Sequence, residues 1–247
     1  MGIAERKERE KQLRRDLILK ASEEVFFEKG LRAATLDEIA ERAEVSKGTI
    51  YLYFASKEDL YYSLMTKGLS MLLKAFEDSE PDETNPRGAL LQLGDAYRRF
   101  SSEQSYLFKM LAVVEDPVVN EQVSPQALSE LEKTSDKVLS YVAKSVRKGI
   151  DTGAFRKDLS PYEAVILFWV SLSGVLNLKA RAAAMRDNEF VDKDSVLHHV
   201  DYDLLYNKCM NFLANLLVGD TTGSNTKNMI AKKSKEMRRH SKGVKQR

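Results

Sequence analysis

Cysteine is almost absent from this sequence: Cys209 is the single one among 247 residues. One cysteine excludes an internal disulfide and any metal site built from several cysteines, and it suits a reducing compartment. An apolar run beside a small-residue cleavage site is also missing near the start, where most residues are charged. We therefore expect no signal peptide and a cytoplasmic protein.

Long hydrophobic runs are absent as well. The longest apolar stretch covers residues 164–178 and is interrupted by four small or polar residues, Ser171, Ser173, Gly174 and Asn177. It is shorter than the roughly 20 residues that cross a bilayer. We expect it to be a buried helix, and we expect no membrane partner.

Sequence patterns of catalysis are missing too. There is no phosphate-binding glycine loop and no nucleophile elbow, and only three histidines are present. His198 and His199 are adjacent, so on a helix they point in different directions and do not form a pair at metal spacing. We expect no enzyme activity, no catalytic residue, no metal and no cofactor.

The net charge of +2 conceals an uneven distribution. Residues 220–247 carry nine basic and two acidic side chains, which leaves 30 basic and 35 acidic ones before them. The opening residues 1–15 hold six basic and three acidic side chains. Both ends could approach a polyanion. The tail, 219–247, has few large apolar residues and is expected to be disordered on its own. It could add contacts to a polyanion or have no function.

Apolar residues recur at helical spacing almost everywhere, and no stretch alternates as a half-buried strand does, so we predict an all-α protein. The first helix is predicted over residues 13–29, with Gly30 as a left-handed cap. Its apolar stripe consists of Leu13, Leu17, Ile18, Ala21, Val25 and Phe26. Two short helices then begin at Thr35, with Glu38 completing a capping box, and at Ser46. A longer helix runs from Ser56 to about Phe76.

The acidic segment 78–86 contains two prolines and is predicted to be a loop. Five further helices are predicted at 87–102, 106–115, 125–152, 161–186 and 201–218. Helices 161–186 and 201–218 are apolar on more than one side. One side can pack within the subunit and the other against a second copy, which predicts a homodimer.

Two short helices joined by a tight turn, with one helix before and one after, can place the second short helix in a major groove. Over residues 12–72 the sequence also resembles the TetR (tetracycline repressor) family. The resemblance is carried by Phe26, Gly30, Thr35, Ile39, Ala40, Ala43, Val45, Ser46, Lys47, Gly48, Thr49, Tyr51, Tyr53, Phe54, Ser56, Lys57, Glu58 and Leu60. It implies a three-helix helix-turn-helix DNA-binding domain (12–72) and, by the similar helical layout, a helical ligand-binding and dimerisation domain (73–218). The charges of the opening residues predict a basic N-terminal arm (1–11) before them.

The resemblance implies that residues 47–53 form the recognition helix, and their chemistry suits this role. Gly48 permits close approach to DNA, while Thr49 and Tyr51 can contact base edges. The expected DNA-binding residues are Arg14, Arg15, Thr35, Ser46, Lys47, Gly48, Thr49, Tyr51, Leu52, Tyr53 and Lys57. The residues expected in the core of the same domain are Leu36, Ile39, Ala40, Ala43, Val45, Ile50 and Phe54. Taken singly, such residues are more often helix caps, solvated charges or core residues. Their occurrence together at the spacing of the family motif favours a role in DNA binding.

Two features oppose DNA binding. They leave open the alternative that the chain is a helical interaction module whose motif no longer binds DNA. Residues 12–60 hold eight basic and ten acidic side chains, so binding requires the acids to face away from DNA; these are expected to be Glu23, Glu24, Glu28 and Glu41. Glu44 stands where the family commonly has glycine. If its backbone is left-handed, the side chain costs about 1 kcal/mol.

In the family, the helices after residue 87 enclose a cavity for an inducer. The expected lining is Tyr97, Phe100, Phe108, Leu111, Tyr141, Phe168 and Trp169, which suits a hydrophobic or aromatic molecule or an acyl chain; core packing is the alternative for each. The expected partners are a pseudo-palindromic double-stranded operator, a second copy of the chain and a small-molecule effector. Repression is the family's default, with the effector releasing the operator.

Overall fold

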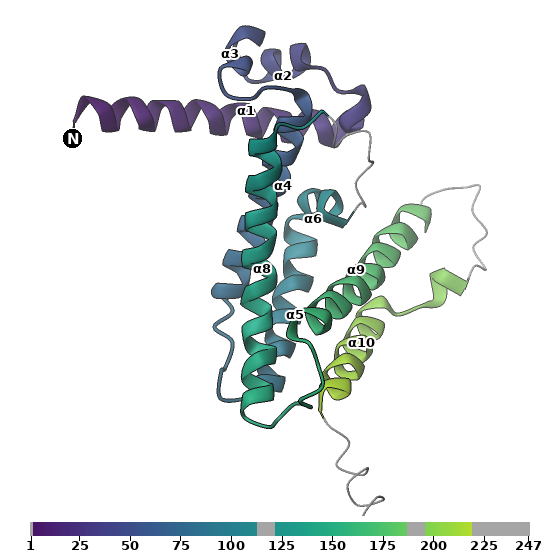
Figure 1. Cartoon of the computed structure of the whole chain (residues 1–247). Coiled ribbons are helices and arrows are strands. Elements are labelled where there is room, and N and C mark those ends of the chain that lie inside the picture. The colour runs from purple at the N-terminus through teal and green to yellow at the C-terminus, as the bar shows by residue number, and fades with distance from the viewer. Residues whose placement is uncertain (1, 113–121, 187–195, 219–247) are drawn as a thin grey trace, which may run out of the picture.

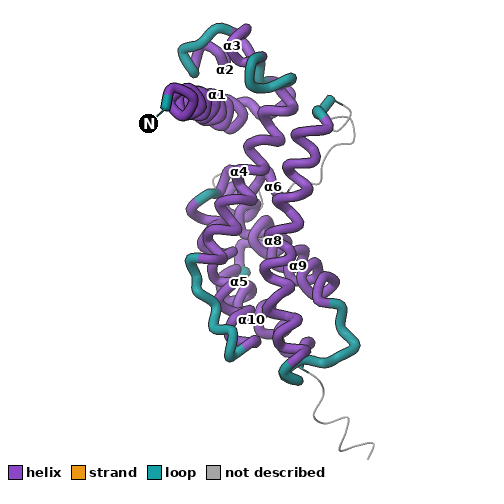
Figure 2. Tube along the Cα trace, turned by 60° about the vertical axis from the view of Figure 1, so that its left-hand side comes forward, coloured by secondary structure: helices purple, strands orange, loops and turns teal. Residues whose placement is uncertain are grey.

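The computed structural model describes residues 2–112, 122–186 and 196–218 (Figure 1). These residues are helical without any strand, which confirms the predicted all-α class. The predicted tail (219–247) and the last part of the predicted helix 106–115 lie outside the described residues. In both views the first helices of the chain gather at one end, and the last helices lie toward the other end (Figures 1 and 2).

The N-terminal end is built by α1 (Ile3–Ala33), α2 (Leu36–Arg42), α3 (Lys47–Tyr51) and α4 (Lys57–Glu77). We call α1, α2 and α3 the head. The predicted caps are present because each short helix needs partners for its first free N–H groups. Thr35 and Glu38 form the capping box of α2, and Ser46 accepts a hydrogen bond from the amide of Thr49 at 3.0 Å.

Helix α1 begins at Ile3, ten residues earlier than predicted, and its first turns project away from the rest of the chain (Figure 1). Because these turns lack a packing partner, two members of the predicted apolar stripe are exposed: Leu13 by 56% and Leu17 by 57%. The stripe is buried only from Ile18 onward. Gly30 has the predicted positive φ of 74°, but its ψ of 165° lies outside the left-handed helical region, and one more turn follows it.

The remaining helices are α5 (Pro86–Glu103), α6 (Ser105–Ala112), α8 (Pro125–Asp151), α9 (Pro161–Arg186) and α10 (Tyr202–Leu217). They agree with the predicted ranges to within a few residues. A short 3-10 helix, η1 (Val196–His199), was not predicted. Helix α4 leaves the head and packs along α8, while α9 packs against α8 and α10. The head and the remaining helices share one continuous hydrophobic core.

Helix α9 differs from the buried helix that the sequence predicts. By length and composition it could cross a membrane over residues 161–185, but only 33% of its most apolar 18-residue segment is buried. The reason is that α8 and α10 cover one side of the helix and leave the opposite side, with Ile166, Leu167 and Val170, open within the subunit.

Candidate nucleic-acid interface and effector cavity

Helix α3 has one buried and one exposed side. Ile50 is fully buried and Phe54, just after the helix, is 4% exposed, so these two residues anchor α3 to the core. On the other side Tyr51 is 52% and Leu52 78% exposed, and Gly48 lies at the surface. An aromatic hydroxyl and a residue without a side chain therefore point out of the head, as a helix that reads a major groove requires.

Thr49 is oriented by the cap of its own helix. Its hydroxyl lies 2.8 Å from the Ser46 hydroxyl, which also accepts the Thr49 amide hydrogen. Thr49 is half-buried, so its side chain sits at the edge of the exposed side and not in the core. Tyr53 is likewise half-buried and packs against the core. Both side chains thus flank the exposed face formed by Tyr51 and Leu52.

The two predicted lysine contacts have different surroundings. Lys47 is exposed and lies 2.9 Å from the carboxylate of Asp37, which raises the pKa of Lys47. The ammonium group of Lys57 instead donates to the main-chain oxygens of Ala34 (3.0 Å) and Arg32 (3.5 Å). Lys57 therefore fastens the start of α4 to the end of α1, whereas Lys47 stands on the surface of α3.

The arginines of α1 also differ. Arg14 is exposed, whereas the guanidinium of Arg15 lies 5.0 Å from the centre of the Phe54 ring and donates to the hydroxyl of Ser63 at 3.4 Å. A cation over an aromatic face is attracted by its quadrupole. Arg15 thus holds α1 beside the end of α3. Thr35 is exposed at the start of α2.

Three of the acids expected to face away from DNA are in ion pairs between helices. Arg42 of α2 binds Glu28 at 2.8 Å and Glu24 at 3.5 Å, and Lys67 of α4 binds Glu23 at 2.7 Å. The Arg42 guanidinium lowers the pKa of Glu28. These carboxylates therefore lie at the junctions of α1 with α2 and α4, and they are neutralised there.

The turn between α2 and α3 has the left-handed backbone that favours glycine. Glu44 has a φ of 53°, and the turn is closed by the amide of Val45, which donates to the Ala40 oxygen at 2.9 Å. A side chain in this conformation costs roughly 1–2 kcal/mol. The geometry of the tight turn is thus retained in spite of the glutamate.

A cavity of about 400 Å³ lies between α4, α5, α6, α8 and α9. Four of the seven residues predicted for it are in its lining: Tyr97, Leu111, Phe168 and Trp169. The other three stand outside the lining. The ring of Phe108 meets Tyr97 edge to face at 5.7 Å, and the ring of Tyr141 stacks on that of Phe76 at 6.4 Å. Phe100 is buried in the core.

Most of the cavity lining was not predicted from the sequence. It comes from α4, α5, α8 and α9: Met65, Leu69, Leu72, Phe76, Leu90, Leu93, Gly94, Leu131, Ser135, Val138, Leu139, Val142, Val165 and Leu172. Helical spacing does identify these apolar faces. It cannot distinguish a face that fills a core from a face that leaves a space, because this depends on how the helices pack.

The cavity is apolar apart from the polar groups of Tyr97, Ser135 and Trp169, and none of the described residues that line it is charged. Tyr97 is hydrogen bonded to Trp169 and to Ser173, whose hydroxyl is 2.7 Å away. Burial raises the pKa of Tyr97 to about 12, so the phenol is uncharged at neutral pH. Ser135 of α8 supplies a further polar group.

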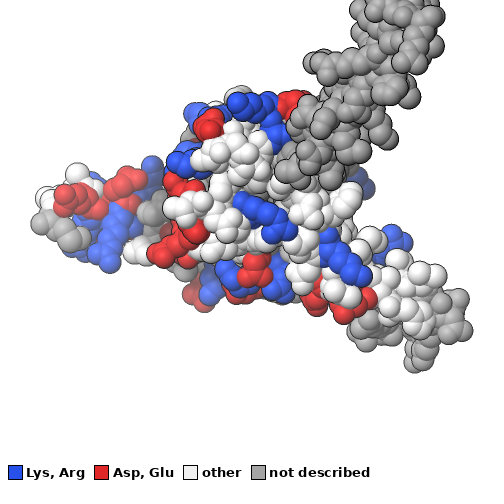
Figure 3. Space-filling view, turned by 90° about the horizontal axis from the view of Figure 1, so that it is seen from below, with Lys and Arg blue, Asp and Glu red and all other residues white. Residues whose placement is uncertain are grey.

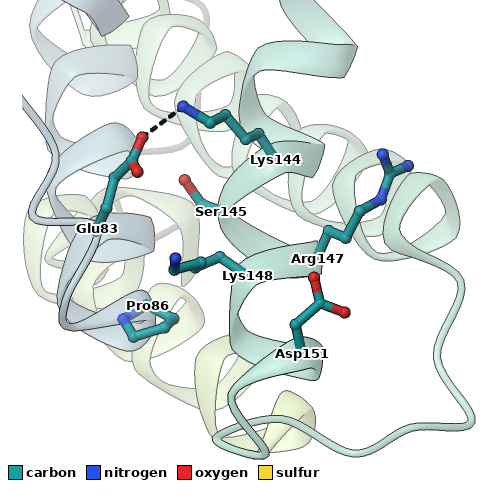
Figure 4. Close-up of a pocket in the computed structure, with 8 residues that line it drawn as sticks. Glu83, Pro86, Lys144, Ser145, Arg147, Lys148 and Asp151 are labelled. Carbon is teal, nitrogen blue, oxygen red and sulfur yellow. Dashed lines mark hydrogen bonds and ion pairs between the residues drawn. The ribbon is translucent and has the colours of Figure 1, made fainter.

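A smaller hollow of about 170 Å³ lies between α8 and the loop before α5 (Figure 4). Lys144 pairs with Glu83 at 2.5 Å, and Arg147, Lys148 and Asp151 line the same hollow. Charges of both signs are therefore present in it. The view of the molecule from below likewise shows basic and acidic side chains interspersed with uncharged surface (Figure 3). The charges that line the hollow therefore do not favour an anionic ligand over a cationic one.

Helices α9 and α10 present an uncovered apolar surface, which we call the α9–α10 face. Its exposed members are Tyr162, Ile166, Leu167, Trp169, Val170, Leu178, Leu204, Leu205, Phe212, Leu216 and Val218. Phe212 is the most exposed, at 64%. Groups of exposed apolar side chains are typical of surfaces that bind another protein or a ligand.

Comparison with known proteins supports the interpretation of the head. Residues 18–64 match the family model described as bacterial regulatory proteins, tetR family. An uncharacterized HTH-type transcriptional regulator of Bacillus subtilis (strain 168), YhgD, is 30% identical over 148 residues, which cover 58% of this chain and 72% of YhgD. The transcriptional activator FasR of Mycolicibacterium smegmatis is 30% identical over 131 residues, covering 53% of this chain and 59% of FasR.

The fold is also found in solved structures. The transcriptional regulator FadR from Bacillus subtilis, crystallised in complex with stearoyl-CoA, aligns with a TM-score of 0.59 at 20% identity, covering 81% of this chain and 97% of FadR. The helix-turn-helix head and its relatives define a DNA-binding transcriptional regulator. The chain belongs to the TetR family of bacterial regulatory proteins.

Proposed function

We propose that the protein is a homodimer that binds a pseudo-palindromic operator through two copies of α3 and releases it when a hydrophobic effector fills the cavity. The observation that carries the DNA-binding part is the exposed side of α3, where Tyr51 and Leu52 face outward while Ile50 anchors the helix. A two-fold dimer presents two such helices, which predicts two half-sites separated by one turn of duplex or a multiple of it.

The α9–α10 face supports the dimer. Each of its two helices buries one side within the subunit and leaves another apolar side open, as described above. A second copy would cover both open sides at once and form a four-helix interface. Gly174 is exposed on α9, and a methyl group at this position would meet no described residue within 4 Å outside its own stretch of helix. A facing helix could therefore approach closely there.

The composition of the cavity supports a neutral, hydrophobic effector. Burying an ion without a partner is costly, and the described lining offers no counter-charge, so any charged head group would stay outside. The stearoyl-CoA bound to FadR has this division into an apolar chain and a charged head. An effector that binds better to one arrangement of the two heads lowers operator affinity by the same coupling free energy. We take repression as the default outcome.

Selection of DNA from a random pool by the full chain tests the DNA-binding proposal. The expected result is a palindrome whose half-sites are one helical turn, or a multiple of it, apart. Salt-sensitive binding without sequence preference would instead support an interaction module, a second candidate that the −2 charge of residues 12–60 favours.

Thermal unfolding tests the effector proposal with stearoyl-CoA and a neutral steroid as probes and free CoA as the control. A ligand of the folded state raises the unfolding temperature. We expect an increase with at least one apolar probe, a smaller increase in Val138→Trp, which fills the cavity, and no increase with free CoA. An equal increase with free CoA, or none with either apolar probe, would contradict the proposed effector class.

A further inference from the structure

The first turns of α4 and α8 meet at a buried carboxylate. Asp59 in the first turn of α4 is only 6% exposed, and it accepts a 2.7 Å hydrogen bond from the main-chain amide of Ser124, which caps α8. Beside it the Ser56 hydroxyl donates to the Gln122 oxygen at 3.3 Å. We call these four residues the α4–α8 junction.

The carboxylate suits this place for a physical reason. The N-terminus of a helix carries unpaired N–H groups and a partial positive charge, which favour an anion. At the junction Asp59 lies in the first turn of α4, and its carboxylate accepts the amide hydrogen of Ser124 at the start of α8 at 2.7 Å. The amide of Asp59 itself donates to the Ser56 hydroxyl at 3.0 Å. A hydrogen bond to a charged acceptor is stronger than one between neutral groups. The two helices are thus joined at their starts.

The junction lies between the two functional parts of the chain. On one side, residues 52–56 alone separate the end of α3 from the start of α4. On the other side, Leu131 and Ser135 of α8 line the cavity, and Leu131 lies about two helical turns beyond Ser124. A movement of α8 caused by a ligand would therefore reach the start of α4, and with it α3, through the Asp59–Ser124 hydrogen bond.

We propose that Asp59 is a positioning residue for DNA binding: it ties α4 to α8 and thereby sets where α3 stands relative to the cavity. This goes beyond the family's recognition helix and cavity, because it assigns a role to a residue that lines neither. The effect on operator spacing rests on the proposed dimeric function, whereas the mechanical link between the helices does not.

A pair of substitutions at Ser124 isolates the hydrogen bond. Ser124 has φ −65° and ψ 146°, angles that proline adopts, so Ser124→Pro removes the amide hydrogen without changing these angles. It also removes the hydroxyl that caps α8 by accepting from the Ala127 amide at 3.2 Å. Ser124→Ala loses the same cap but keeps the amide, and it is the matched control. From the other side, Asp59→Ala removes the acceptor and Asp59→Asn keeps one.

Amide hydrogen exchange of the full chain without DNA is the first measurement. We expect residues 57–64 to exchange about tenfold faster in Ser124→Pro than in Ser124→Ala, and faster in Asp59→Ala, as for the loss of one charge-assisted hydrogen bond. Asp59→Asn should remain within about threefold of the wild type. Equal exchange in Ser124→Pro and Ser124→Ala would overturn the proposal, and so would equal exchange in Asp59→Ala and Asp59→Asn.

Operator spacing is the second measurement. The DNA that the wild type selects is compared with the same DNA carrying one extra base pair between the half-sites. We expect the wild type and Ser124→Ala to discriminate strongly, and Ser124→Pro and Asp59→Ala to lose about tenfold of this preference. Unchanged preference would overturn the assigned role in positioning α3. If the wild type selects no palindrome, the dimeric function fails, while the exchange measurement still decides whether the junction exists.

Discussion

Glu44 has a backbone conformation that is unfavourable for a residue with a side chain. Its φ of 53° lies in the left-handed region, where a side chain costs roughly 1–2 kcal/mol. Glycine removes this cost but loses about 0.5–1 kcal/mol of conformational entropy. We expect Glu44→Gly to raise the free energy of unfolding by up to about 1 kcal/mol, measured by urea denaturation.

Glu44→Ala is the control for this prediction, because alanine keeps the strained backbone but removes the charge. It should leave the free energy of unfolding nearly unchanged. Equal stabilisation by alanine and glycine would show that the charge, and not the backbone, is responsible.

Glu38 predicts a dependence of stability on pH. Hydrogen bonds from Lys29 and then from Thr35 lower its pKa from 4.5 to about 2. A carboxylate whose pKa is lower in the folded state stabilises that state above the unfolded pKa, and this contribution is lost as the pH falls from about 4.5 to about 2. We expect the unfolding temperature of the wild type to fall more steeply over this range than that of Glu38→Gln, which retains an acceptor for the capping box. Parallel curves would contradict the assignment.

Tyr51 and Lys47 should affect DNA binding in different ways. Tyr51 is exposed on α3, so we expect Tyr51→Ala to change which sequences a random-pool selection recovers. Lys47 is an exposed cation near the start of the same helix, so Lys47→Ala should weaken binding to all sequences and reduce the salt slope by about 1. A change of sequence preference in Lys47→Ala and none in Tyr51→Ala would reverse the two assignments.

Lys57 shows how a sequence match can leave a residue's contacts undecided. The resemblance places it among the DNA-binding residues, and in the structure its ammonium group donates to the main-chain oxygens of Arg32 and Ala34. The sequence identifies a conspicuous cation after α3. It cannot indicate that the Lys57 ammonium lies 3.0 Å from the main-chain oxygen of Ala34 at the end of α1.

At the scale of elements, helical spacing predicted the helices well but could not show which faces are covered. Leu13 and Leu17 have the spacing of a buried stripe and are exposed, because α1 extends beyond its neighbours. The start of α1 was missed for a related reason. Residues 3–12 are highly charged and have no apolar stripe, so helical periodicity gives no signal there.

The end of α8 depends on one close contact. A methyl group at Gly149 would overlap the ring of Phe155, whose amide also donates to the Gly149 oxygen at 2.9 Å. We expect Gly149→Ala to lower the free energy of unfolding by about 1–3 kcal/mol in urea denaturation, because the ring must move.

Gly48→Ala is the comparison for Gly149→Ala, since a methyl group there meets the Ser46 hydroxyl at an ordinary 3.7 Å. It should leave stability unchanged or raise it by up to about 1 kcal/mol through helix propensity. A loss of stability as large as that of Gly149→Ala would show that the close contact with Phe155 is not the cause.

At the scale of the whole molecule, the α9–α10 face predicts a stability that depends on association. If a second copy covers this face, the unfolding temperature falls on dilution, because association stabilises the folded state by mass action. We expect the unfolding temperature to rise with protein concentration, and Phe212→Glu to yield a monomer by gel filtration without this dependence.

Leu13→Glu is the matched control, since Leu13 on α1 is nearly as exposed as Phe212 but lies outside the α9–α10 face. It should remain a dimer with an unchanged concentration dependence. Dissociation of both variants would place the interface elsewhere, and a wild-type monomer at micromolar concentration would contradict the dimer.

The sequence by itself determined most of the helices, the caps of α2 and α3 and the side of α3 that carries Tyr51, because these depend on periodicity and on contacts between residues three or four positions apart. Only the tertiary structure decided that α4 and α8 line the cavity, that Lys57 bonds the end of α1 and that Asp59 accepts a hydrogen bond from the Ser124 amide. The physical reason is that cavities and buried hydrogen bonds arise between segments distant in sequence. Their meeting depends on how whole helices pack, which local patterns do not encode.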